Sequence, residues 1–154
     1  MASPNGKYPF FTSSTKKIER INEYSFEGDA ILITNTGSSA INLFRGKFEA
    51  SNNCFVVFDK RIKKFSLLYL LQEAIKINLE NFYKEDSGGI KHLKSKKLSE
   101  LKIIIPDNKT LEKFNEICEN IQLKIENLQK NIERLEIMKN DLHKMIFNQK
   151  ISVI

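Results

Sequence analysis

The fold of this chain is decided by one stretch, residues 111–142, which reads LEKFNEICENIQLKIENLQKNIERLEIMKNDL. Apolar residues recur in it every three and four positions, as they do in a coiled coil. Neither proline nor glycine interrupts the chain after Pro106. The pattern predicts one long helix with a narrow hydrophobic seam. Because a single helix cannot bury such a seam by itself, we expect a partner helix.

The seam consists of two sets of positions, each repeating every seven residues. The first set is Leu111, Cys118, Ile125, Ile132, Lys139 and Ile146, and the second is Phe114, Ile121, Leu128, Leu135 and Leu142. Isoleucine in one set with leucine in the other is typical of parallel dimers. A parallel in-register pair, however, would oppose two Lys139 side chains in its core, which is unfavourable. The residues expected at the interface with the partner helix are Phe114, Cys118, Ile121, Ile125, Leu128, Ile132, Leu135 and Leu142.

Residues 1–106 alternate between short apolar runs and turn residues, which is typical of a β-rich domain. Strands are predicted at Tyr8–Phe11, Ala30–Thr34, Ile41–Phe44, Phe48–Ala50, Cys54–Phe58 and Leu101–Ile105. Turns are predicted at 26–29, at 35–39, where Gly37 or Asn35 would take a positive φ, and at 45–47 as a tight hairpin. Helical periodicity over Ser66–Tyr83 predicts a core helix that lies on the sheet.

The predicted fold class is therefore α+β. A small β-rich domain of mixed or antiparallel strands with a packed helix occupies residues 1–106. The long helix occupies residues 107–154, with N-cap candidates between Asp107 and Thr110. A length of 154 residues suits one such domain and an extension.

Composition excludes several classes of protein. No apolar run is long enough to cross a membrane, and the first residues lack the apolar stretch of a signal peptide. The two cysteines, Cys54 and Cys118, lack metal-type spacing and are interpreted as reduced thiols. We therefore predict a cytoplasmic protein.

The net charge of +6 is concentrated in the middle of the chain. Between Arg61 and Lys109 there are eleven basic and six acidic residues, whereas the long helix is neutral. Clustered lysines on a folded domain fit a surface that faces phosphates. The alternative is an ordinary solvated face in a lysine-rich chain.

Catalysis is poorly supported by the sequence. Neither the phosphate-binding loop of nucleotide hydrolases nor a dinucleotide-binding glycine motif is present. The only histidines, His92 and His143, lie on different segments, which argues against a catalytic triad or a zinc site. The acidic residues near Asp107 suit helix capping better than a nuclease centre. We predict a protein without catalytic activity or a cofactor of its own.

The polar loops instead suit nucleic-acid binding. Hydroxyls and cations share the Thr12–Lys17 loop, small polar residues fill the 35–39 turn and the pair Asn52-Asn53, and a glycine pair precedes the cations of residues 91–97. Such groups can donate to phosphates, and some can read base edges. The candidate DNA-binding residues are Thr12, Ser13, Ser14, Lys16, Lys17, Thr36, Ser38, Ser39, Lys91, His92, Lys94 and Lys97.

The order of motifs resembles the specificity subunit of type I restriction-modification systems, with one target-recognition domain and one conserved spacer helix. The resemblance covers nearly the whole chain, although family subunits usually carry two of each. It is carried by Gly6–Ser14, Gly28–Ile33, Gly37, Gly46–Ser51, Cys54–Phe58, Ser87–Leu93, Leu101–Pro106 and the tail from Met138 to Val153.

The resemblance implies a DNA-reading, non-catalytic subunit. Its recognition domain would bind one half of a split target in double-stranded DNA. Its helix would pair antiparallel with a second copy to form a homodimer, which also avoids the Lys139 contact of a parallel pair. It would set the half-site spacing and dock methyltransferase subunits, with the restriction and translocase subunit as a further partner. S-adenosylmethionine would be bound by the methyltransferase. The alternative is a coiled-coil assembly or regulatory protein, or a truncated relic, that binds the methyltransferase without reading DNA.

Overall fold

The computed structural model describes residues 6–13, 19–58 and 65–148. The chain divides into two compact units, residues 1–115 and 116–154. The first unit contains the sheet, the shorter helices and the start of the long helix. The second unit is the rest of that helix. The α+β fold class is thereby confirmed.

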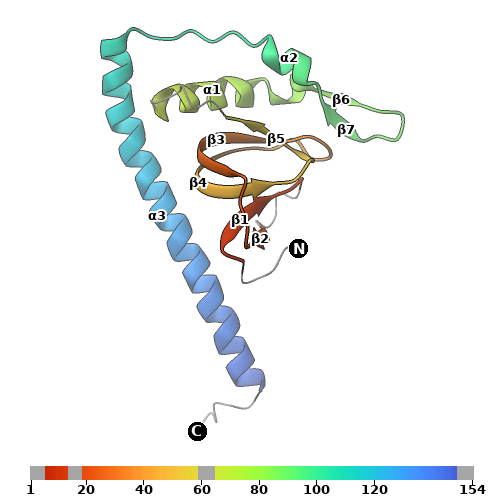
Figure 1. Cartoon of the computed structure of the whole chain (residues 1–154), viewed down its shortest axis with the longest axis vertical. Helices are drawn as coiled ribbons and strands as arrows, with labels where there is room; N and C mark the ends of the chain where they lie inside the picture. The colour runs from red at the N-terminus through yellow and green to blue at the C-terminus, as the bar shows by residue number, and fades with distance from the viewer. Residues whose placement is uncertain (1–5, 14–18, 59–64, 149–154) are drawn as a thin grey trace. The chain divides into compact units, whose positions relative to one another are not determined.

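A five-stranded sheet forms the centre of the first unit (Figure 1). Its strands are β1 (Tyr8–Phe11), β2 (Glu19–Ile21), β3 (Phe26–Thr34), β4 (Ile41–Ala50) and β5 (Cys54–Val57), in the order β2-β1-β4-β3-β5. All pairs are antiparallel except β1 with β4, which is parallel. The sheet is therefore mixed, as the sequence predicted.

Two predicted turns are wrong, because the glycines that suggested them lie inside continuous strands. Gly28 of β3 and Gly46 of β4 face each other directly across the ladder. Their φ angles are 134° and 120°, a region that glycine adopts without strain. Kinks at facing positions bend both strands together. Strand β4 ends at Ala50, close to the start of β3, and β5 begins four residues later at Cys54, which pairs with Thr34 at the end of β3. The bend explains how so short a connection can join these two places.

Helix α1 (Phe65–Ile77) lies over one face of this sheet (Figure 1). The predicted core helix over Ser66–Tyr83 is confirmed as far as Ile77, and a 3-10 turn, η1 (Leu79–Phe82), follows it. The hairpin of β6 (Tyr83–Glu85) and β7 (Lys91–Leu93) and the short helix α2 (Ser95–Ser99) complete this layer. One core joins them to the sheet: Ile31, Ile33, Leu68, Ile75, Phe82, Tyr83, Leu93 and Leu98.

A second core, rich in phenylalanine, lies on the opposite face of the sheet. Because side chains alternate along a strand, Ile31 and Ile33 point to the helical layer while Ala30 and Leu32 point away from it. Phe48 is fully buried in the second core and stacks on Phe26 with 5.1 Å between ring centroids. Aromatic packing thus holds the bent strands without a covering helix among the described residues.

The strand predicted at Leu101–Ile105 is wrong. These residues have no regular structure, and the exposed fractions of Ile104 and Ile105 are 92% and 63%. The apolar run suggested a buried strand, but it is a connection between α2 and the long helix.

The long helix, α3, spans Asn108–Phe147 and is 40 residues long. Asp107 caps it by accepting hydrogen bonds from the backbone N–H and the hydroxyl of Thr110 at 3.0 and 2.7 Å. The predicted helix is confirmed as far as Phe147, and so is its N-cap; residues 149–154 of the predicted span lie outside the described residues. In the part of the chain that the structure describes, no helix has the length and apolar character needed to cross a membrane. Cys54 and Cys118 are both free thiols.

Candidate nucleic-acid interface

Polar segments from distant parts of the chain are joined by backbone hydrogen bonds. The N–H of Ser51 donates to the carbonyl oxygen of Phe11 at 2.8 Å, which ties the end of β1 to the turn between β4 and β5. The N–H of Asn35 donates to the carbonyl oxygen of Asn53 at 2.8 Å, which ties that turn to the one between β3 and β4. Thr12 and Ser13 directly follow Phe11, so three of the polar loops are neighbours.

Strand β7 extends this row of loops. The N–H of Gly37 donates to the carbonyl oxygen of Lys91 at 3.0 Å, and the N–H of Leu93 donates to the carbonyl oxygen of Asn35 at 2.9 Å. Thr36 and His92 therefore face each other in an isolated antiparallel bridge. Gly37 has a φ of 84°, as predicted for the 35–39 turn. We call the segments 12–13, 51–53, 35–39 and 91–92 the polar rim.

A buried hydroxyl pair fixes the middle of the rim. The Thr34 side chain is 5% exposed, and its hydroxyl donates to the carbonyl oxygen of Ser38 at 2.6 Å and accepts from the N–H of Ala40 at 3.0 Å. The Tyr83 hydroxyl donates to the carbonyl oxygen of Thr34. Burial raises the pKa of Tyr83, so this hydroxyl keeps its proton at neutral pH. Tyr83, which belongs to the helical layer, thereby fixes the 35–39 turn.

The charges of the β6–β7 hairpin are largely compensated. The Lys91 ammonium lies 2.6 Å from a carboxylate oxygen of Glu80. This contact raises the pKa of Lys91 and lowers the pKa of Glu80, to which the Ser39 side chain also contributes. His92 Nε2 lies 2.9 Å from Asp86. Lys91 therefore presents less free positive charge to a ligand than an unpaired lysine would.

Asp86 organises the tip of the same hairpin. Its Oδ1 accepts from the N–H groups of Gly88 and Ile90, both at 2.9 Å. The Ile90 amide, followed by His92, lowers the pKa of Asp86. The carboxylate thus serves the turn and is not presented to a ligand.

Lys94 and Lys97 extend into solvent from helix α2. The backbone N–H of Lys94 donates to the carbonyl oxygen of Phe82 at 2.7 Å, which fixes the start of α2 against η1. Lys97 Nζ donates to the carbonyl oxygen of Asn81 at 3.3 Å, and Lys96 is also exposed. Unlike Lys91, none of these three ammonium groups has a carboxylate within the 4.0 Å ion-pair distance among the described residues. They are the uncompensated charge next to the rim.

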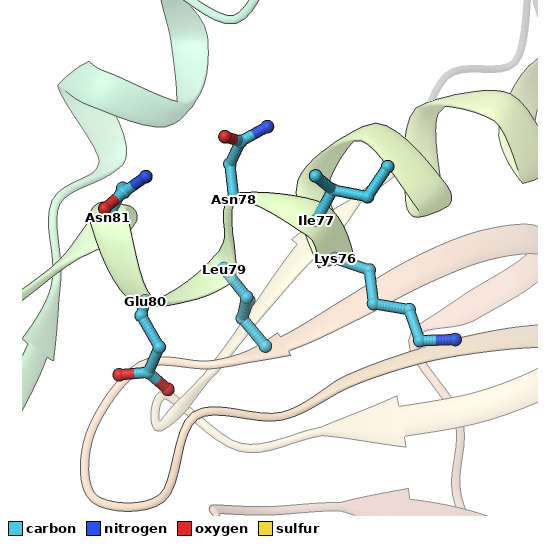
Figure 2. A pocket seen from close by; sticks show the side chains of 6 residues that line it. All are labelled: Lys76, Ile77, Asn78, Leu79, Glu80 and Asn81. Atoms are coloured by element: carbon cyan, nitrogen blue, oxygen red, sulfur yellow. The ribbon is translucent and has the colours of Figure 1, made fainter.

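The depression beside Glu80 does not look like a ligand pocket. It is lined by Lys76, Ile77, Asn78, Leu79, Glu80 and Asn81. Figure 2 shows Lys76 and Glu80 pointing to one side of this segment while Asn78 and Asn81 point to the other. Ligand pockets instead bring polar groups together over an apolar floor. Within the ranges that the structure describes, no group of three or more histidine, cysteine or acidic residues could hold a metal ion.

The structure thus brings together seven of the predicted DNA-binding residues: Thr12, Ser13, Thr36, Ser38, Ser39, Lys91 and His92. Lys94 is the N-cap of α2 and Lys97 lies on this helix. Ser14, Lys16 and Lys17 lie outside the described residues. The sequence prediction named the Asn52-Asn53 pair as a polar loop but left it out of the candidate residues, and it missed Glu80. The Asn52-Asn53 pair was a signal for the turn, whereas the Glu80 contact had none, because it depends on tertiary structure.

The seam of α3 is exposed over most of its length. The exposed fractions are 53% for Ile121, 41% for Ile125, 61% for Leu128, 56% for Ile132, 63% for Leu135 and 50% for Leu142. Two other residues expected at the dimer interface differ. Phe114 is half-buried, with its ring centroid 6.2 Å from that of Tyr69, and Cys118 is buried.

Comparison with protein families decides where this arrangement belongs. A family model described as the type I restriction modification DNA specificity domain matches residues 2–142. The chain belongs to this family. The resemblance to type I specificity subunits is thereby confirmed.

Individual relatives of this specificity domain are longer proteins. The chain is 26% identical over 134 residues to the type I restriction enzyme EcoDI specificity subunit of Escherichia coli, and the match covers 87% of this chain and 29% of that subunit. It is 29% identical over 162 residues to a type I specificity subunit of Mycoplasma pneumoniae, covering 95% of this chain and 51% of that one. The chain therefore spans about half or less of the length of these relatives.

A solved structure has the same fold as the specificity domain. The crystal structure of the type I restriction-modification S subunit from M. genitalium superposes with a TM-score of 0.69. The match covers 96% of this chain and 40% of that one, at 18% identity. Sheet, packed helix and long helix thus recur together in a specificity subunit.

Proposed function

We propose that this chain reads one half of a split DNA target within a type I restriction-modification complex, and that the polar rim and helix α2 are the surface that does so. The observation that carries the proposal is the row of backbone hydrogen bonds that joins four polar segments. Such a surface offers hydroxyls, amides and backbone donors that can read base edges. The lysines of α2 beside it suit contacts to phosphates, which position a protein on DNA.

The chain acts in this proposal without catalysis of its own. Methylation would be performed by methyltransferase subunits that dock on it and carry S-adenosylmethionine, and cleavage by the restriction and translocase subunit. Helix α3 would be the spacer. Its 40 residues extend about 60 Å at 1.5 Å per residue, which is near two turns of B-DNA. A second copy would supply the partner helix, so that two recognition domains read a two-fold symmetric site.

Selection from a random duplex library tests the reading of DNA. The full chain, alone and with its methyltransferase, is expected to enrich one sequence motif and to retain it at 150 mM salt. Enrichment of no motif would contradict sequence recognition and would favour the alternative of an assembly protein that binds the methyltransferase only.

A lysine variant tests where the DNA lies. Replacing Lys91, Lys94 and Lys97 together with alanine should weaken binding and flatten its dependence on salt, because each lost phosphate contact reduces the slope by about 0.9. Exchange of Lys124, Lys130 and Lys144 on α3 for alanine removes the same charge elsewhere and is the matched control. If both triple variants bind alike, the rim and α2 are not the DNA-binding surface.

A further inference from the structure

The exposed part of the α3 seam has a defined beginning. Leu111 is 3% exposed and Cys118 is 7% exposed, so neither leaves a face for a partner. From Ile121 onward, the apolar seam residues are between 41% and 63% exposed, and Lys139 is exposed among them. The eight exposed seam positions are Ile121, Ile125, Leu128, Ile132, Leu135, Lys139, Leu142 and Ile146.

We propose that a second copy of the chain docks on these eight positions, antiparallel, with the two-fold axis between Glu133 and Arg134. In an antiparallel homodimer, residues equally far from the axis in opposite directions face each other. This axis pairs Ile132 with Leu135, Leu128 with Lys139, Ile125 with Leu142 and Ile121 with Ile146. Every exposed seam position obtains a partner, and each pair joins one set of the heptad to the other. The proposal deepens the pairing of two copies stated above and rests on it.

Neighbouring registers fit the exposed seam less well. An axis half a heptad earlier, at Lys130, would place Ile146 and Leu142 opposite Phe114 and Cys118, of which the first is half-buried and the second buried. An axis half a heptad later, at Ile137, would leave Ile121 and Ile125 without partners among the residues that the structure describes. Burying these two side chains is worth about 1.5–3 kcal/mol each, so the later register is disfavoured.

Charge along the two helices agrees with the proposed register. Lys139 would face Leu128, over which its aliphatic stem can lie while the ammonium reaches water. In a parallel in-register pair it would face another Lys139. The flanking positions bring together Gln122 and His143, Gln129 and Glu136, Lys124 and Met145, and Asn131 and Met138. None of these pairs joins like charges, so nothing at the edges of the seam opposes the pairing.

The register determines the length of the spacer that the two paired helices form. With the axis between Glu133 and Arg134, the two Asn108 residues that begin the helices lie about 76 Å apart along the axis. Complete overlap of the two helices would separate them by about 60 Å. The spacer is therefore longer than one helix, and the difference corresponds to about five base pairs of DNA at 3.4 Å per pair.

Disulfide trapping in the full chain tests the register. In a background with Cys54→Ala and Cys118→Ala, chains carrying I125C are mixed with chains carrying L142C and oxidised. We expect the mixed disulfide to form at least 10-fold faster than in I125C mixed with L135C, the pair of the earlier register, or in I125C alone, the product of a parallel pair. Faster trapping in either control would overturn the proposal.

Distance measurement avoids changes in the seam. Burial raises the pKa of Cys54 to about 11 and also raises that of Cys118, so a spin label reacts preferentially at an exposed cysteine introduced by Lys113→Cys. The proposed register separates the two labels by about 61 Å along the axis, the earlier register by about 51 Å, and a parallel pair by less than about 20 Å. A distance near either alternative would overturn the register.

Light scattering on the same samples tests whether the chain dimerises, independently of the register. A dimer with another distance contradicts only the register. A monomer at 50 μM would contradict pairing and register together. DNA selection with the monomer would then still decide whether the rim reads DNA.

Discussion

The hydroxyl of Tyr83 donates a hydrogen bond to the backbone carbonyl oxygen of Thr34 and lies 3.1 Å from the Thr34 hydroxyl. Tyr83 begins β6, and Thr34 ends β3, so one contact connects the hairpin to the central sheet. Both residues are buried. The contact holds the 35–39 turn in the conformation that places it beside β7.

Replacing Tyr83 with phenylalanine should lower the free energy of unfolding by about 1–2 kcal/mol, because a buried carbonyl loses its donor. Affinity for the selected DNA should fall further than stability alone explains, since the turn is part of the rim. Urea unfolding and fluorescence polarisation measure the two effects. Tyr8→Phe removes a hydroxyl from a half-buried side chain of β1 and is the control. Equal behaviour of the two variants would show that the contact does not organise the turn.

The facing glycines of β3 and β4 should not tolerate side chains equally. An alanine Cβ at Gly28 would lie 3.0 Å from Cε2 of Phe58 at a φ of 134°, so Gly28→Ala should cost about 2–3 kcal/mol. At Gly46 the nearest atom is 3.8 Å away, so only the strained φ remains, at about 1 kcal/mol. Gly88→Ala, at an ordinary φ, should change the unfolding midpoint little. An equal cost at all three sites would argue against a kinked strand pair.

Glu80 holds the Lys91 ammonium in an ion pair, so Glu80→Gln should release the ammonium and strengthen binding to DNA. If the released ammonium reaches a phosphate, the slope of log affinity against log salt should steepen by up to about 0.9. Glu27→Gln makes the same change of charge and releases Lys47 from an ion pair of 3.7 Å, away from the rim. An increase of similar size in both variants would indicate a general charge effect without a role for Lys91.

Asp107 should make the stability of the chain depend on pH in the acidic range. The Thr110 amide, followed by the Thr110 hydroxyl, lowers the pKa of Asp107 in the folded state. Its contribution is therefore fully present above the ordinary pKa of 3.8 and is lost as the pH falls through the lower folded value. Asp107→Ala should lower the melting temperature at pH 7, and the difference from the wild type should shrink below pH 3. Asp107→Ser retains a capping oxygen and should lie between them.

Local periodicity was sufficient to predict α3, α1 and most strands, since these elements depend on residues close in sequence. The bend in β3 and β4 was not predictable in this way. A glycine between apolar runs is compatible with a tight turn or with a kinked strand, and the choice at Gly46 depends on Gly28 facing it from another strand. The run Leu101–Ile105 was also misleading, because Leu101 packs on the core while Ile104 and Ile105 are exposed, so its apolar character does not come from a buried strand.

The sequence was sufficient to predict most residues of the candidate site, but not how they are arranged in space. Polar loops at 12–13 and 35–39 and the cations of 91–97 were visible in the sequence. That they adjoin depends on hydrogen bonds between residues up to 58 positions apart, such as Gly37 to Lys91 and Leu93 to Asn35. The compensation of Lys91 by Glu80 likewise needs η1 and β7 to be neighbours.

Four hydrogen bonds that connect the segments of the polar rim join backbone atoms: Ser51 to Phe11, Asn35 to Asn53, Gly37 to Lys91 and Leu93 to Asn35. Except at Gly37, whose φ is positive, the side chains at these junctions are not required to hold the frame. The backbone arrangement of the rim and the identity of its side chains can therefore be changed independently. Under the proposed function, exchanging the side chains of residues 12–13, 36, 38 and 51–53 should change the DNA target while the sheet keeps its shape, which makes this rim a practical starting point for engineering new target specificity.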